Sequence, residues 1–306
     1  MRAAVVGAVG STAILLEELA NSDQWDVPIV VTLPQELYRR HSDLVELSPF
    51  AERLGSRLFR TGKTNDPGTL QAIDEAQPDY VFVVGWSQLC SADFLAIRPG
   101  KVIGYHPAPL PRLRGRAALP WTILLDERIT AGSLFWMGEG TDDGDLLAQH
   151  YFHLAGDETV AELYDRHMRC LSRMLQEVLP SLAAGDETRT RQDERCATWA
   201  AKRTPADGLI DWHDDTRSID RLIRAVGRPY PGAYSFVGKR KITIWRSEIV
   251  TQPSRYHAKA GQIVEREEGT LRIATKDGLL ALTDWEIEGE KPPLLHSILR
   301  SERATD

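Results

Sequence analysis

The chain has 306 residues, of which 42% are hydrophobic and 26% charged, and its formal net charge is −7. This is the composition of a globular protein with one large or two medium domains, and the acidic balance argues against a chain built mainly to coat nucleic acid or an anionic membrane. Cys90, Cys170 and Cys196 are widely spaced and form no Cys-x-x-Cys pair, so we expect neither a disulfide framework nor a metal site.

The sequence shows no secretion or membrane signal. Residues 1–7 run directly into a strand-like segment, without a basic region followed by a long apolar stretch. No apolar run approaches the roughly 20 residues that cross a bilayer. We therefore expect a cytoplasmic protein without a membrane partner.

The first half alternates short apolar runs with helical patterns, which is typical of strand-helix-strand units and a parallel sheet. Residues 79–85, with Val-Phe-Val-Val at their centre, are the best candidate for a central strand buried on both faces. Further strands are expected at 3–6, 27–33, 102–105 and 132–137, and helices at 13–19, 49–54 with Ser48 as a possible cap, 68–76 and 120–125. The pattern predicts an α/β fold, a Rossmann-like, mostly parallel sheet with helices on both faces.

The second half begins with an amphipathic helix expected from Gly156-Asp157-Glu158 to about residue 182. Residues 183–194 are polar and suit an exposed linker. A helix is expected at 219–226, followed by strands at 233–237, 241–245, 262–264, 271–274 and 279–286. Five short strands at this spacing suggest a small barrel or sandwich. The predicted domains are 1–185, a linker at 186–204, and a smaller C-terminal β-barrel (OB-like) domain at 205–306.

His106 and Asp142 are the candidate catalytic pair. His106 follows the strand at 102–105, and catalytic groups of open parallel sheets lie beyond the carboxyl ends of strands. An imidazole that meets a carboxylate from a second loop can move a proton at neutral pH. Asp142 and Asp143 also suit a simple turn before Gly144.

A row of arginines lies in the loop that His106 opens. Arg112, Arg114 and Arg116 alternate along it, which fits either phosphate contact or a solvated charge run. Residues 201–250 hold ten Lys or Arg against six Asp or Glu, an excess of 10 − 6 = +4. A phosphate-bearing substrate is consistent with both features.

The motifs themselves resemble a known family. The run His106-Pro-Ala-Pro-Leu-Pro-Arg-Leu-Arg-Gly-Arg-Ala117, with Trp121 and then Gly140-Thr-Asp-Asp-Gly-Asp-Leu-Leu-Ala-Gln149, closely resembles the folate-dependent formyltransferases. Arg-Thr-Pro-Ala-Asp-Gly-Leu-Ile-Asp-Trp at 203–212 and Pro-Tyr-Pro-Gly-Ala-Tyr-Ser-Phe-Val-Gly at 229–238 look like the C-terminal domain of the formyltransferase portion of the UDP-4-amino-4-deoxy-L-arabinose-modifying enzyme.

This resemblance implies a folate-dependent N-formyltransferase. Its co-substrate would be 10-formyltetrahydrofolate, carried by the N-terminal domain, and its acceptor the primary amine of a nucleotide-linked amino sugar. His106 would be the general base and Asp142 its orienter. The segments that match the family's folate contacts are Trp86, Ser87, Gln88, Leu89 and Cys90, and Gly138, Glu139, Gly140 and Thr141 with Asp142.

One position departs from the family pattern. Gly104 stands two residues before His106, where the family places a catalytic Asn. Loss of one oxyanion donor typically costs about 2.7–4 kcal/mol of transition-state stabilisation. A replacement could come from protonated His106, from Ser87 or Gln88, from an ordered water beside Gly104, or from Tyr105, although a strand points Tyr105 to the opposite side.

Several alternative functions stay open at this level. Methionyl-tRNA formyltransferase shares both domains, but residues 32–41 lack the Gly- and Lys-rich insertion of the tRNA enzymes. Formylation of another small amine, and a catalytically impaired folate- or nucleotide-sugar-binding homologue, are the others. The acidic charge argues against a nucleic-acid partner, and the domain arrangement leaves room for a homodimer.

Overall fold

The computed structural model describes residues 1–40, 43–252, 255–289 and 291–302. His41, the last residue of the segment compared above with the tRNA enzymes, lies outside them. The chain forms two compact units. The first comprises Met1–Ala118, Ile129–His153 and Tyr164–Ala200, and the second comprises Leu119–Arg128, Leu154–Leu163 and Ala201–Asp306. The last boundary between the two units falls between residues 200 and 201, inside the predicted linker 186–204. The domain limits at 185 and 205 stay predictions.

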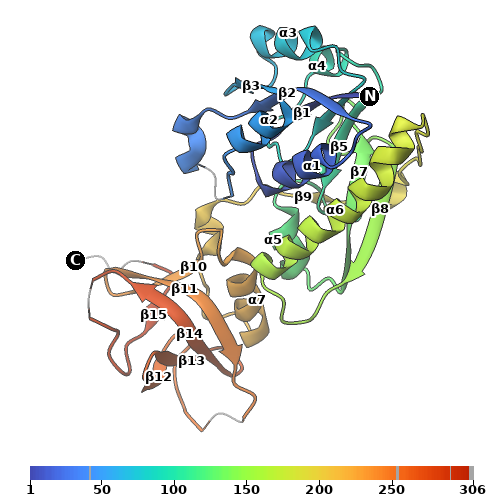
Figure 1. Ribbon diagram of the computed structural model, residues 1–306. Coiled ribbons are helices and arrows are strands. Elements are labelled where there is room, and N and C mark those ends of the chain that lie inside the picture. Colours follow the sequence, from blue (N-terminus) through green and yellow to red (C-terminus); the bar gives the residue numbers. More distant parts are fainter. Residues whose placement is uncertain (41–42, 253–254, 290, 303–306) are drawn as a thin grey trace. The chain divides into compact units, whose positions relative to one another are not determined.

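The first unit is built on a seven-stranded sheet of order β3-β2-β1-β4-β5-β7-β8 (Figure 1). Its first five strands are parallel, and β7 and β8 are antiparallel to their neighbours. The strands are β1 Arg2–Val6, β2 Asp26–Thr32, β3 Arg57–Arg60, β4 Tyr80–Val83, β5 Val102–His106, β7 Ile129–Trp136 and β8 Leu146–His153. The predicted mostly parallel sheet is confirmed.

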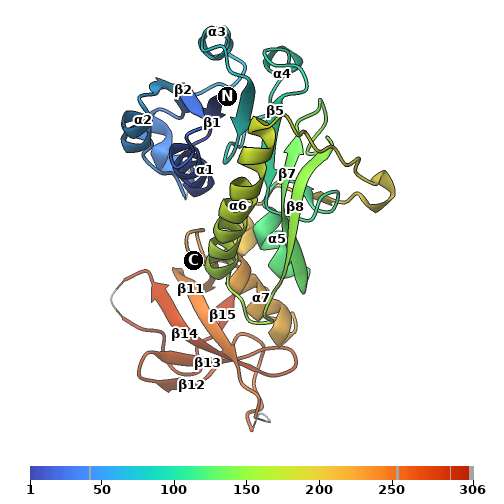
Figure 2. The same cartoon turned by 45° about the vertical axis from the view of Figure 1, so that its right-hand side comes forward.

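Helices cover both faces of this sheet (Figure 2). They are α1 Gly10–Ala20, α2 Ser48–Leu54, α3 Pro67–Glu75, α4 Ala92–Leu95 and, from Tyr164 onward, α6 Val160–Ala183. The unit also contains the 3-10 helices η1 Gln35–Arg40 and η2 Glu194–Cys196, and a two-stranded parallel pair, β6 Arg114–Gly115 with β9 Trp199–Ala200.

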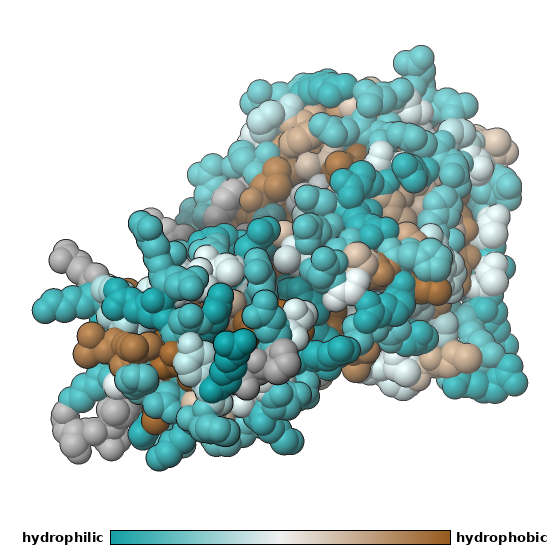
Figure 3. All heavy atoms as spheres, turned by 90° about the horizontal axis from the view of Figure 1, so that it is seen from below, coloured by the Kyte–Doolittle hydropathy of each residue, from teal (hydrophilic) through white to brown (hydrophobic). Residues whose placement is uncertain are grey.

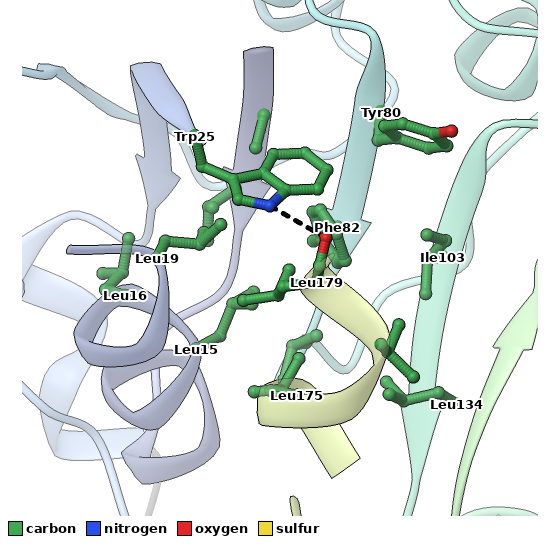
Figure 4. Packing of buried hydrophobic residues seen from close by; sticks show 14 of the residues in the cluster. Leu15, Leu16, Leu19, Trp25, Tyr80, Phe82, Ile103, Leu134, Leu175 and Leu179 are labelled. Carbon is green, nitrogen blue, oxygen red and sulfur yellow. Dashed lines mark hydrogen bonds between the residues drawn. The ribbon is translucent and has the colours of Figure 1, made fainter. Parts of the chain in front are cut away.

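Alternation along the strands separates two cores. Ala3 and Val5 of β1 pack with α1, α2 and α6, whereas Ala4 and Val6 belong to the cluster that includes residues of α3 and α4. In the first core, the Trp25 ring packs edge-on against Phe82, in the same cluster as Leu15 and Leu175, and its Nε1 donates to the Leu179 carbonyl at 3.1 Å (Figure 4). This bond ties α6 to the loop before β2 and satisfies the only polar atom of a large buried side chain.

The second unit carries a six-stranded antiparallel sheet of order β12-β13-β14-β11-β10-β15. The strands are β10 Ala233–Val237, β11 Arg240–Ile249, β12 Ile263–Glu267, β13 Thr270–Ala274, β14 Leu279–Ile287 and β15 Leu299–Arg300; the helices are α5 Ala118–Leu124, the 3-10 helix η3 Pro205–Gly208 and α7 Thr216–Val226. Gln262, before β12, bridges to Ile298, before β15, and Ile263 donates to the Ser297 carbonyl. The two edges of the sheet thus meet, which makes it barrel-like, as predicted.

Three local expectations need correction. Ser48 does not cap α2: Leu47 holds the cap position, and the Ser48 hydroxyl donates to Glu46. The strand expected at 241–245 continues to Ile249, and β8 was not anticipated because its burial does not alternate cleanly. The segment 183–194 is not wholly exposed, since Gln192 is only 4% exposed.

Polar side chains cover most of the face seen in Figure 3, and apolar residues lie between them in small groups. Across the described residues, no helix combines the length and the apolar character that a membrane span requires.

Gly7, directly after β1, packs closely against Val84, directly after β4. A substitution at Gly7 therefore tests whether this close packing is needed for stability. A Cβ at Gly7 would overlap the Val84 carbonyl and the Thr12 side chain, which are themselves joined by a 2.7 Å hydrogen bond. We expect Gly7→Ala to lower the free energy of unfolding by about 1–3 kcal/mol, the usual cost of overpacking. Gly62→Ala is the matched control, because its new Cβ would meet only Leu37 at an ordinary 3.5 Å. Equal stability of the two variants in urea denaturation would contradict this packing.

Candidate active site

His106 lies at the carboxyl end of β5, with its side chain buried. Its Nε2 is 2.7 Å from the backbone carbonyl oxygen of Leu113, and its Nδ1 is 3.5 Å from Oδ2 of Asp142. Both partners come from loops beyond the strand ends, the first after β5 and the second after β7. The structure therefore brings together the two residues that the sequence singled out.

The contact with Leu113 fixes where the ring carries its proton. A carbonyl oxygen can only accept, so the hydrogen bond requires a proton on Nε2 of His106. In the neutral ring, Nδ1 then bears the lone pair. At 3.5 Å from Asp142, this nitrogen lies beyond an ordinary hydrogen-bond distance, yet close enough for the carboxylate to stabilise a proton placed on it.

Asp142 is held from both its backbone and its side chain. Its φ is +53°, a left-handed conformation that few non-glycine residues adopt. Oδ2 accepts from the Gly115 backbone at 2.8 Å, and the Asp142 carbonyl accepts from Nε2 of Gln192 at 2.8 Å. The carboxylate therefore stands at a fixed point beside the imidazole.

The glycines of the segment 138–144 accommodate the neighbouring Asp143. A Cβ at Gly140 or Gly138 would meet the Asp143 carboxylate, and one at Gly144 would overlap the Trp136 carbonyl. Asp143 thus packs within the turn and Asp142 faces His106. The two adjacent aspartates have different tasks, one structural and one at the site.

Leu113 also has a left-handed backbone, with φ +58°. Its N–H donates to Oγ1 of Thr198 at 2.9 Å. Earlier in the same loop, the Ala108 carbonyl accepts from Ser133, and the Leu110 carbonyl accepts from Gln149. Hydrogen bonds at Ala108, Leu110 and Leu113 hold the loop in place. They allow Leu113 to keep its unfavourable positive φ.

The space beside Gly104 is filled by hydrophobic side chains. A Cβ at this position would lie 2.8 Å from Cζ of Phe135 and 3.2 Å from Cγ of Met137. The place that a Cβ would take is therefore filled by apolar atoms, which argues against an ordered water there as the replacement for the missing Asn. Gly104 and Phe135 are also paired in register across β5 and β7, so the small and the large residue complement each other.

The predicted folate segment 86–90 follows β4 and is tied to residues 62–65. Trp86 Nε1 donates to Thr64 Oγ1 at 2.6 Å, and Gln88 donates to the Gly62 carbonyl and accepts from Thr64. These bonds orient the Gln88 amide: its oxygen accepts from Thr64, and one of the two hydrogens of its nitrogen is donated to Gly62. Burial raises the pKa of the Cys90 thiol to about 12, so it is no nucleophile at neutral pH.

The three loop arginines differ in their surroundings. Arg114 is 2% exposed and bonds to Gln192 and, bidentately, to Glu194. Its guanidinium is therefore engaged within the protein. Arg112 and Arg116 are exposed and remain the candidates for phosphate contact.

Tyr105, which is half-buried, and the buried His167 were not identified from the sequence as a pair. Tyr105 points to the face opposite Gly104 and lies 3.1 Å from Nδ1 of His167 through its hydroxyl. Burial, with a smaller effect of His106, lowers the pKa of His167 to about 3. Among the described residues, Nε2 of His167 has no hydrogen-bond partner. A neutral histidine at this depth adds no positive charge near His106.

Two family models match this chain. The formyl transferase model covers residues 1–179, and the model of the formyl transferase C-terminal domain covers residues 202–303. Together the two models account for most of the chain, and both describe formyl transferases. The chain belongs to the formyl transferase family.

Solved structures show the same fold at low sequence identity. A variant of HypX from Aquifex aeolicus has a TM-score of 0.67 at 21% identity over 93% of this chain, which spans only 45% of HypX. An N-formyltransferase from Helicobacter canadensis, in complex with folinic acid and dTDP-3-aminofucose, has a TM-score of 0.70 at 16% identity, covering 92% of this chain and 98% of that one. Methionyl-tRNA formyltransferase from Clostridium thermocellum has a TM-score of 0.60 at 17% identity, covering 82% and 94%.

The packing beside Gly104 predicts the result of restoring the family's Asn. We expect Gly104→Asn to destabilise the protein by about 1–3 kcal/mol, because its Cβ collides with the Phe135 ring. The same substitution should cost less in a Phe135→Ala background, where the ring is absent. A double-mutant cycle measured by urea denaturation gives this coupling. Equal costs in both backgrounds would show that Phe135 does not restrict position 104.

His167 predicts a specific acid sensitivity. Its pKa is about 3 in the folded chain and about 6.5 when unfolded, so between these values the unfolded state binds one more proton. The stabilisation is complete above pH 6.5 and is lost as the pH falls. Between pH 7.5 and pH 5, the wild type should lose about 2 kcal/mol more than His167→Gln. Urea denaturation at both pH values measures this, and a pH-independent difference between the proteins would refute the assignment.

Proposed function

We propose that this enzyme transfers a formyl group from 10-formyltetrahydrofolate to the primary amine of a nucleotide-linked amino sugar. The observation that carries the proposal is the orientation of His106: its Nε2–H is bonded to Leu113, and its Nδ1 lone pair lies beside the Asp142 carboxylate. An amine that attacks a formyl carbon must lose a proton, and the Nδ1 lone pair of His106 can accept it.

The proton balance can be followed atom by atom. The neutral amine forms a C–N bond with the formyl carbon, the C–N bond to the donor breaks, and the amine proton passes to Nδ1 of His106. The resulting imidazolium is stabilised by Asp142 on one side and by the Leu113 carbonyl on the other. The proton then returns to the departing donor nitrogen, so that His106 is regenerated neutral.

Oxyanion stabilisation must come from a group other than an Asn at position 104. The space beside Gly104 is occupied by Phe135 and Met137, and Tyr105 faces the other side of the sheet. The remaining candidates are the His106 imidazolium, the exposed Ser87 and the second N–H of the Gln88 amide. We assign the larger part to His106, because its charge appears as the oxyanion develops.

The residues present fit a folate at the two predicted segments. Leu89 is 74% exposed, although its backbone carbonyl is fixed by Asn65 at 3.0 Å. An apolar side chain held outward on an ordered loop suits contact with a flat heterocyclic ring. Trp86, Ser87, Gln88, Leu89 and Cys90 would hold the donor together with Gly138, Glu139, Gly140 and Thr141, and the folate would supply the formyl group.

An amino sugar carried on a nucleotide is the acceptor best supported. The Helicobacter canadensis enzyme, whose structure contains a dTDP-linked amino sugar, is covered almost completely, and the tRNA enzyme matches less of this chain at a lower TM-score. The exposed Arg112 and Arg116 can contact a diphosphate. The net charge of −7 disfavours a tRNA acceptor.

The test is formyl transfer from 10-formyltetrahydrofolate to a panel of dTDP- and UDP-linked amino sugars, with methionyl-tRNA as the competing acceptor. We expect at least one sugar to be formylated, and His106→Gln to lower kcat by about 100- to 10,000-fold. His150→Gln is the matched control, because His150 pairs with Glu177 away from the loops described here. Formylation of the tRNA and of no sugar would overturn the proposal.

A further inference from the structure

Residues 187–200 form a strap along the first unit. At its beginning, Glu187 bonds to Tyr80 and Lys101, and the Thr188 carbonyl accepts from Trp136. Thr190 then exchanges two backbone hydrogen bonds with Leu146. At its end, β9 pairs with β6 in the His106 loop. A segment predicted as an exposed linker is thus bonded at successive points.

Gln192 lies at the centre of the strap and is 4% exposed. Its Nε2 donates to the carbonyls of Asp142 and Gly144, at 2.8 and 2.7 Å. Its Oε1 accepts from Arg114, which in turn binds Glu194 of the strap. Both donors of the amide therefore hold the turn that presents Asp142, and a side chain without an amide nitrogen cannot do this.

Thr198 performs the equivalent task for the other partner of His106. Its Oγ1 accepts from the Leu113 backbone N–H, and the Leu113 carbonyl accepts from Nε2 of His106. Leu113 and Asp142 both have positive φ values, +58° and +53°. This backbone is unfavourable for a leucine and is tolerated by an aspartate, so the need for outside support is greater at Leu113.

We propose that Gln192 and Thr198 are the positioning residues of the catalytic pair: Gln192 sets the carboxylate that faces Nδ1 of His106, and Thr198 sets the carbonyl that fixes the proton on Nε2. Neither residue touches the reacting atoms. The inference rests on the proposed role of His106 as the base. Since misplacement by about 1 Å can cost about 100-fold in rate, loss of either support should lower kcat.

Two substitutions test the proposal. Gln192→Leu keeps the size of the side chain and removes both donors, and Thr198→Val keeps the shape and removes the hydroxyl acceptor. We expect each to lower kcat about 10- to 100-fold with little change in KM. We also expect each to shift the ¹⁵N ring resonances of His106, read from histidine-labelled protein without any substrate. Thr198→Ser retains the hydroxyl, so we expect its kcat and its His106 ¹⁵N resonances to stay close to those of the wild type.

Glu187→Gln is the control on the same strap. It weakens the contacts with Tyr80 and Lys101 and leaves the bonds to Asp142 and Leu113 in place. It should lower the melting temperature and preserve kcat and the His106 resonances. If Gln192→Leu and Thr198→Val behave like this control, the strap is merely structural and the proposal is wrong. If the resonances shift but the wild type formylates no acceptor, the positioning role stands and the proposed function fails.

Discussion

The hydrogen bond from Nε2 of His106 to the Leu113 carbonyl is the interaction on which the site depends. Because the carbonyl cannot donate, this bond decides which ring nitrogen is protonated and leaves Nδ1 to face Asp142. A histidine at the same strand end without this acceptor could present either nitrogen. The protonation of the His106 ring is thus set by a backbone atom seven residues further along the chain.

Both partners of His106 have a left-handed backbone conformation. Leu113 and Asp142 each have a positive φ, and each is held by a side chain of the strap, Thr198 and Gln192. Strain of this kind persists only where surrounding bonds over-determine it. The polar strap therefore does more than connect the two units, because it supplies the bonds that keep both partners of His106 in place.

Local patterns predicted most of the elements that carry the site. The apolar runs at 79–85, 3–6 and 27–33 became β4, β1 and β2, and the Asp-Gly turn chemistry placed Asp142 in a tight turn. Gln192 gave no such signal. It lies among polar residues in a stretch without periodicity, and its burial depends on the Asp142 and Gly144 carbonyls, which are distant along the chain.

The sequence by itself determined the class of sheet, the positions of His106 and Asp142 and, through its motifs, the expectation of formyl transfer. These follow from residue type and short-range spacing, which need no knowledge of distant contacts. Only the tertiary structure decided that Phe135 fills the space beside Gly104, that Arg114 is buried against Glu194, and that Nδ1 is the nitrogen that faces the carboxylate. Each of these depends on which segments meet in space, and pairings between β5 and β7, or between the strap and the two loops, are not encoded in any one stretch of the chain.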